Sequence, residues 1–249
     1  MSNFRVIPKL LIDCDGGLVV TEGFRKRRYV GDPLNAVRIF NKKHADELLI
    51  LFIDASSRGK KPDFGFVREV VEESYMPVTI GGGLSDSSVI DSIFSCGIER
   101  VSINTAITNG KLCRNLIDTY GAQSIIGSLD FKSTYFGRRK IIRPGKPQLS
   151  NIRDEIQRIS DLGVGELHIG SVNNDGTWRG VDPFCESLKI NHLSIPVIYS
   201  GGIGNIGHFD DARLIGFSGV AVGSFFCLSG KGKGVLITYP KLEDRRNAG

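Results

Sequence analysis

The chain has 249 residues, of which 41% are hydrophobic and 24% charged, and its formal net charge is +5. This length fits one large domain or two smaller ones, and the composition is that of a globular protein with a sizeable core. The sequence lacks a secretory signal pattern and any apolar run near the roughly 20 residues that cross a membrane, so we expect a cytoplasmic protein without membrane association. The modest basic excess, without a nucleic-acid motif or interleaved aromatic residues, favours an anionic small substrate over nucleic acid.

Short apolar segments rich in β-branched residues alternate with amphipathic stretches along the chain. The candidate strands are Val6–Ile12, Leu48–Ile53, Val78–Ile80, Val101–Ile103, Ser124–Leu129, Leu167–Val172, Val197–Tyr199 and Val220–Val222. Helical periodicity lies between them, for example in Pro62–Glu73, Ser85–Ser95 and Ile152–Leu162. Eight such βα units in this length predict a single (β/α)₈ barrel over residues 1–249 rather than an open sheet.

The chain also repeats itself at one constant offset. PVTIGGG begins at Pro77 and PVIYSGG at Pro196, which is 119 residues later. The same offset relates Val101 to Val220 and Leu10 to Leu129. Matches at a single offset in several segments indicate two similar halves of four strands each. A barrel built from two half-barrels would leave this repeat.

Glycines and small polar residues cluster where strands are expected to end. Without side chains, glycines let backbone amides approach an anion closely, although a tight turn with no ligand is the plainer interpretation of any one pair. Loops after strands seven and eight of such barrels often bind phosphate. We therefore predict opposed phosphate sites, one at Gly82, Gly83, Asn104 and Thr105 and the other at Gly201, Gly202, Gly223 and Ser224. A third polar cluster after strand six contains Gly176 and Thr177.

Carboxylates are candidates for proton transfer at the same mouth. Asp130 ends the fifth strand, where a carboxylate would face the mouth, although a helix N-cap is the alternative. Its equivalent in the first half is Leu11, and Asp13 shares the face of Leu11 in strict alternation. Asp175 lies in the polar cluster after strand six. Asp130 is thus the main catalytic candidate, with Asp13 or Asp175 as its assistant.

Charged residues also stand at the opposite ends of four strands. They are Arg5, Glu47, Arg100 and Glu166. Two acids and two bases at strand starts could close the bottom of the barrel as an ion-pair ring, and charges at strand starts usually serve stability.

The remaining reactive residues suggest little chemistry of their own. The five cysteines are scattered, and the four histidines show no metal spacing, so we expect neither a disulfide framework nor a metal or cofactor site. No base partner for Cys14 follows it in the sequence. The basic run from Arg25 to Arg28 is either a solvated loop or a phosphate-steering element.

Several motifs together resemble one family. IPKLLIDCDGG, VGDP, ADELLILFIDAS, PVTIGGGL, VSINTA, SIIGSLD, NNDGT and IPVIYSGGIG are similar, in order, to motifs of HisF, the cyclase subunit of imidazole glycerol phosphate synthase. The resemblance covers about residues 5 to 226. It implies a glutaminase subunit on the barrel bottom, ammonia passing up the barrel, and a substrate held between two phosphate sites. It also implies that Asp130 is the general acid/base and that the four charged residues gate ammonia.

The chain departs from the family pattern at three positions. Leu11 and Phe52 replace aspartates at the ends of strands one and two, and Val20 replaces a lysine of the first loop. In these respects the chain resembles HisF paralogues that accompany surface-polysaccharide genes, which implies ammonia delivery to a sugar nucleotide. A histidine-pathway cyclase and a non-catalytic phosphometabolite-binding scaffold are the alternatives. An NAD-binding enzyme ranks below them because no GxGxxG opens a first helix.

Overall fold

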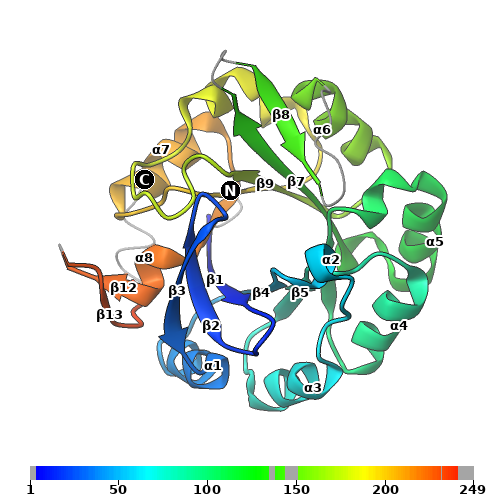
Figure 1. The fold of residues 1–249 in the computed structure, drawn as a ribbon. Coiled ribbons are helices and arrows are strands. Elements are labelled where there is room, and N and C mark those ends of the chain that lie inside the picture. Colours follow the sequence, from blue (N-terminus) through cyan, green and yellow to red (C-terminus); the bar gives the residue numbers. More distant parts are fainter. Residues whose placement is uncertain (1–3, 135–137, 144–150, 231, 241–249) are drawn as a thin grey trace.

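The computed structural model describes residues 4–134, 138–143, 151–230 and 232–240. Eight parallel strands form a closed ring (Figure 1). In their order around the ring they are β1 (Arg5–Ile12), β4 (Leu48–Phe52), β5 (Val78–Gly81), β6 (Arg100–Ile103), β7 (Ile125–Ser133), β9 (Glu166–Ser171), β10 (Val197–Ser200) and β11 (Gly219–Val222). Parallel pairing of β11 with β1 closes the ring. The predicted (β/α)₈ barrel is confirmed, with most strand ends within a residue or two of those expected.

Helices surround the strands as an outer layer (Figure 1). They are α1 (Pro33–Lys42), α3 (Phe64–Glu73), α4 (Ser87–Ser95), α5 (Gly110–Tyr120), α6 (Ile152–Asp161), α7 (Gly207–Ile215) and α8 (Ser224–Cys227). The short helix α2 (Ala55–Arg58) lies over the strand ring beside β5 instead (Figure 1). The side chains of Asp63 and Asp86 cap α3 and α4, which explains why both begin two residues later than periodicity predicted. After β9 the chain forms a 3₁₀ helix, Pro183–Leu188, instead of an α-helix. Within the described ranges, no helix is long and apolar enough to span a membrane.

The apolar core lies mainly between the strands and the helices. Alternation along each strand sends one set of side chains outward, such as Leu10, Ile50 and Ile80, all fully buried there. The other set points into the barrel, where Ile7, Leu49, Ile198 and Ala221 form a second, smaller cluster. The interior of the barrel is therefore only partly filled by apolar side chains.

Two barrel strands continue into antiparallel extensions above the mouth. β1 turns into the hairpin β2 (Leu18–Glu22) and β3 (Lys26–Gly31), and β7 turns into β8 (Arg139–Ile142). The sequence did not predict these strands, and the basic run now lies largely in β3. The extensions start from β1 and β7, so they follow the half-barrel repeat. A short pair near the C-terminus, β12 (Leu228–Ser229) and β13 (Gly234–Val235), stands apart from the barrel.

Candidate functional site

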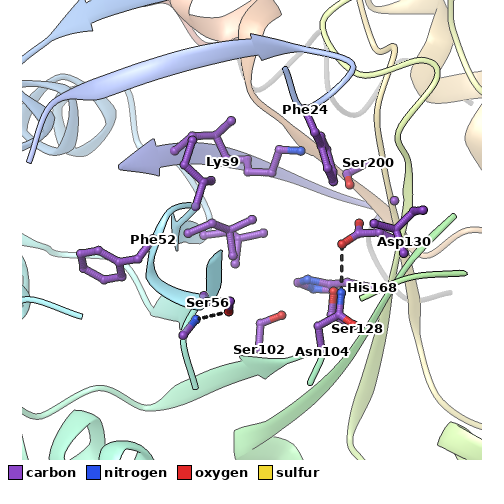
Figure 2. Close-up of a pocket in the computed structure, with 18 of the residues that line it drawn as sticks. Lys9, Phe24, Phe52, Ser56, Ser102, Asn104, Ser128, Asp130, His168 and Ser200 are labelled. Atoms are coloured by element: carbon purple, nitrogen blue, oxygen red, sulfur yellow. Dashed lines mark hydrogen bonds between the residues drawn. The ribbon is translucent and has the colours of Figure 1, made fainter. Parts of the chain in front are cut away.

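A cavity of about 460 Å³ runs from the carboxyl ends of the strands into the barrel. The β2–β3 hairpin supplies Phe24 and Arg27 to its lining. Phe24 and His168 are among the lining residues drawn in Figure 2. The charged lining residues are Lys9, Arg27, Asp130, Arg143 and, when protonated, His168. Lys9, Arg27 and Arg143 outnumber the one carboxylate of the lining, but each also pairs with a carboxylate outside it, namely Asp175, Asp54 and Glu155, which offsets part of this positive charge.

Asp130 lies in this cavity, as predicted (Figure 2). Its Oδ2 accepts a hydrogen bond of 3.0 Å from Asn104 Nδ2. Asp130 pairs with Gly170 of β9, and a Cβ at Gly170 would lie 2.1 Å from Asp130 Oδ1, so only glycine leaves room for the carboxylate. Burial raises the pKa of Asp130 to about 6, against the lowering effect of Lys9. Such a carboxyl group can exchange protons near neutral pH, as a general acid or base must.

Leu11 occupies the repeat-related position on β1. Leu11 pairs with Val19 near the start of the antiparallel strand β2, and Asp130 pairs with Ile142 at the end of the antiparallel strand β8. Leu11 also lines the cavity, so an apolar side chain stands where the other half-barrel has its carboxylate.

Asp13 lies elsewhere, contrary to its predicted place beside Asp130. Its Oδ1 accepts hydrogen bonds from the amides of Asp15 and Gly17, at 3.0 and 2.9 Å, and so stabilises the turn after β1. It borders a separate hollow next to α3. The β-turn breaks the strict alternation that would have put Asp13 on the same face as Leu11.

Asp175 and Lys9 form a charged pair under the β2–β3 hairpin. Asp175 Oδ2 accepts a 2.5 Å hydrogen bond from the Thr21 hydroxyl, and Lys9 Nζ lies 4.0 Å from Asp175 Oδ1. Both members of the pair are buried. Asp175 thus fastens the hairpin over the mouth, and Lys9 places a positive charge between it and Asp130. Sequence reasoning missed Lys9, although a lysine inside an otherwise apolar strand was a signal for it.

The first predicted phosphate site opens onto the cavity. Its four residues, Gly82, Gly83, Asn104 and Thr105, all line it. The Gly83 amide donates a 3.1 Å hydrogen bond to the Ser56 hydroxyl (Figure 2). At Gly82 the φ is +87° and a Cβ would lie 2.3 Å from the Phe52 carbonyl oxygen, so this turn requires glycine. The Gly83 amide, the Ser56 and Thr105 hydroxyls and the Asn104 side-chain amide face one space. An oxyanion there would have to take over the Gly83 amide from Ser56 and the Asn104 amide from Asp130.

The second predicted phosphate site differs from the expectation. None of Gly201, Gly202, Gly223 and Ser224, nor Gly176 and Thr177 beside them, is among the residues that line the cavity. The Trp178 indole N–H instead donates a 2.9 Å hydrogen bond to the Ser224 hydroxyl. The segment after β9 therefore covers this side of the mouth.

The four charged residues at the strand starts form an ion-pair ring. Arg5 contacts Glu47 at 2.8 Å and also pairs with Glu166. Arg100 contacts the same two carboxylates at 2.9 and 3.0 Å. The exposed fraction of the Glu166 side chain is only 1%. A hollow on the N-terminal face is lined by Arg5, Arg100 and Glu166, so the ring lies between that hollow and the barrel interior.

His168 connects the ring to the cavity. Its Nε2 lies 2.8 Å from Glu166 Oε1, and its ring also lines the cavity. Burial alone would raise the pKa of Glu166, but the hydrogen bond and charge of His168, together with Arg100 and Arg5, hold that pKa far below its usual value. The sequence predicted no metal site at the histidines, and it did not predict the position of His168 inside the barrel.

Phe52 and Val20, the other two departures from the family pattern, both pack as apolar residues. Phe52 packs edge-on against Phe66 with ring centroids 6.0 Å apart, and Val20 is buried in β2. In the basic run, Arg27 makes two 2.7 Å hydrogen bonds to Asp54 and lines the cavity, whereas Lys26 is largely exposed. Among the described residues, no three histidine, cysteine or acidic side chains are grouped so that they could hold a metal ion.

Comparison with known proteins agrees with this arrangement. The family described as "Histidine biosynthesis protein" matches residues 5–232. The chain is 39% identical to "Putative imidazole glycerol phosphate synthase subunit hisF2" of Pseudomonas aeruginosa, over 96% of this chain and 97% of that protein. It is 37% identical to the similarly named hisF3 of Vibrio vulnificus, over 100% and 97%, and 33% identical to "Imidazole glycerol phosphate synthase subunit HisF" of Streptomyces coelicolor, over 89% of each chain. The chain therefore belongs to the HisF family of imidazole glycerol phosphate synthase subunits.

Proposed function

We propose that this subunit receives ammonia from a HisH-type glutaminase bound at its N-terminal face and uses it on a phosphorylated sugar nucleotide in the cavity at the opposite face. Asp130 is the proton-transferring group, and the turn at Gly82, Gly83 and Thr105 anchors a phosphate. The pathway for ammonia begins at the Arg5–Glu47–Arg100–Glu166 ring. Hydrogen bonds between its members would have to open and close again to let a small molecule through, which makes the ring a gate.

Leu11 is the observation that favours amidination of a sugar over imidazole ring formation. Ring closure in this family uses two carboxylates at opposed strand ends, one as acid and one as base. Here the repeat-related partner of Asp130 is apolar and lines the cavity. Losing a general acid or base slows a reaction by about 10² to 10⁴, or roughly 3 to 5 kcal/mol. A second carboxylate, Asp175, is occupied by the Thr21 hydroxyl and lies near Lys9.

A histidine-pathway cyclase is the second candidate. The Streptomyces coelicolor relative, at 33% identity, is named as an imidazole glycerol phosphate synthase subunit HisF. A non-catalytic scaffold that keeps phosphate binding is the third, because Leu11 and Phe52 replace two side chains that could transfer protons.

One experiment separates the three, because the scaffold alone would transfer nitrogen to none of the compounds offered. The purified subunit is tested alone with ¹⁵N-ammonium, and in complex with a HisH-type glutaminase with ¹⁵N-amide glutamine. Each preparation receives either the histidine-pathway ribonucleotide or a panel of sugar nucleotides. We expect ¹⁵N incorporation into a sugar nucleotide, abolished by Asp130→Asn and unaffected by Asp13→Asn, the matched carboxylate outside the cavity. Imidazole glycerol phosphate formed at rates normal for the family would support the second candidate instead. Incorporation that survives Asp130→Asn would remove Asp130 from the mechanism.

A further inference from the structure

Trp178 covers the turns after β10 and β11. It is the only tryptophan in the chain and lies in the segment that follows β9. Its indole N–H donates to the Ser224 hydroxyl at 2.9 Å, and its ring packs edge-on against Phe225 with centroids 5.9 Å apart. Its backbone φ is +62°, in the left-handed region that bulky residues rarely adopt. A strained conformation of this kind persists only where the surroundings fix it, and such residues cluster at ligand sites.

Several contacts hold this segment against the β10 turn. The Gly180 amide donates a 2.8 Å hydrogen bond to the Gly202 carbonyl oxygen, and a Cβ on Gly202 would lie 2.2 Å from the Gly180 oxygen. A Cβ on Gly204 would lie 2.3 Å from Trp178 Cβ. Lys233 Nζ lies 4.7 Å from the centroid of the indole ring. The glycines after β10 therefore accommodate the Trp178 segment itself.

The half-barrel repeat supplies a comparison within the same molecule. Gly83 and Thr105 are the repeat equivalents of Gly202 and Ser224. The first pair lines the cavity, whereas the second pair does not. Ser224 Oγ accepts a hydrogen bond from the indole N–H, which holds the ring directly over this hydroxyl. An anion at the second pair would have to displace an aromatic side chain that is packed on Phe225 and Lys233.

We infer that Trp178 is a specificity-determining residue that closes one of two repeat-related phosphate sites, so that the substrate is anchored by a phosphate or diphosphate at the β5–β6 side only. This inference rests on the proposed phosphate anchoring at Gly82, Gly83 and Thr105. It excludes substrates with a phosphate at each end of a long molecule. The part of the substrate that reaches toward Trp178 is then uncharged, such as a sugar ring or a base that can pack on the indole.

Inorganic phosphate tests this in the intact protein, by stoichiometry and by tryptophan emission. Calorimetry and ³¹P NMR should give one phosphate per chain, and Thr105→Val should weaken its binding about tenfold through loss of one hydrogen bond to a charged group. Because Trp178 is the only tryptophan, its emission should stay unchanged as this site fills. Trp178→Ala should bind a second phosphate. Phe225→Leu, which changes the same aromatic cluster and leaves the indole on Ser224, should still bind one.

Two phosphates on the unmodified chain, or Trp178 emission that follows phosphate binding, would overturn the inference. So would a folded Trp178→Ala variant, judged by circular dichroism, that still binds one. If Trp178→Ala does not fold, the inference is tested by the number of phosphates that the unmodified chain binds and by its tryptophan emission. Trp178→Phe then supports the inference by binding one phosphate, because its ring still fills the space. If ¹⁵N transfer fails but one phosphate binds, the proposed function is rejected and the inference about Trp178 stands. If no variant binds phosphate, both the proposed phosphate anchoring at Gly82, Gly83 and Thr105 and the inference about Trp178 are rejected.

Discussion

Replacing Glu166 with glutamine removes the most buried charge of the ion-pair ring. Glu166 pairs with Arg5 and Arg100 and lies 2.8 Å from His168 Nε2, while only 1% of its side chain is exposed. The amide keeps the size of the carboxylate but leaves two guanidinium groups without one of their two shared counter-ions. Removing one partner of a buried ion pair costs about 3 to 5 kcal/mol, which we expect as the loss in free energy of unfolding at pH 7. Glu47→Gln is the matched control, and its loss should be smaller because Glu47 is more exposed.

The pH dependence of this loss provides a second check. The pKa of Glu166 is lowered in the folded chain, so its stabilising contribution is complete above the unfolded value of about 4.3 and is lost as pH falls below it. Urea unfolding of both proteins at pH 7 and pH 3 measures the difference. The difference in free energy of unfolding between the two proteins should be smaller at pH 3 than at pH 7. A loss below about 1 kcal/mol at pH 7, the value of an exposed pair, would refute the account of a buried network.

Three further outcomes concern Asp130 and its surroundings. Gly170→Ala places a methyl group about where Asp130 Oδ1 lies, so ¹⁵N transfer should be lost while circular dichroism still reports a folded barrel. With a pKa of about 6, Asp130 acting as a base should give transfer rates that rise as pH increases through about 6, measured as a pH profile. Lys9→Met removes the main group that lowers this pKa, so the rising limb should move to higher pH, whereas exposed Lys26→Met should leave it in place.

The sequence predicted the barrel because its signals are local and repeated. Apolar segments such as Val197–Tyr199 are typical of buried strands, and segments with helical periodicity, such as Ser85–Ser95, lie between them. The β2–β3 hairpin was missed because Lys26, Arg27 and Arg28 follow one another without an apolar face. Strand pairing across the mouth stabilises this segment, and a local pattern of polar residues cannot reveal such a partner.

The site was predictable where position alone fixes a side chain. Asp130 follows an apolar strand at a mouth that the fold defines, and the offset of 119 residues places Leu11 opposite it. Lys9 and His168 depend on which face of a strand points inward, which is known only once the register is known. Trp178 reaches its place through a loop conformation with positive φ, for which the sequence carries no signal.

The inner wall of the barrel is polar on one side, and this predicts a role for His168. Ser102, Ser128 and His168, on the neighbouring strands β6, β7 and β9, line the cavity between the ring and Asp130, whereas Ile198 and Leu49 line the other side. In the proposed transfer, ammonia that leaves the ring meets hydrogen-bonding groups along the wall that leads to Asp130. His168→Leu should therefore reduce incorporation of glutamine-derived nitrogen more than incorporation of free ammonium, which also reaches the cavity from its mouth. The complex supplied with amide-¹⁵N-labelled glutamine and unlabelled ammonium measures both in one sample, with Ile198→Leu as the control on the apolar side. Equal loss of the two nitrogen sources would rule out a role of His168 in the passage of ammonia from the ring.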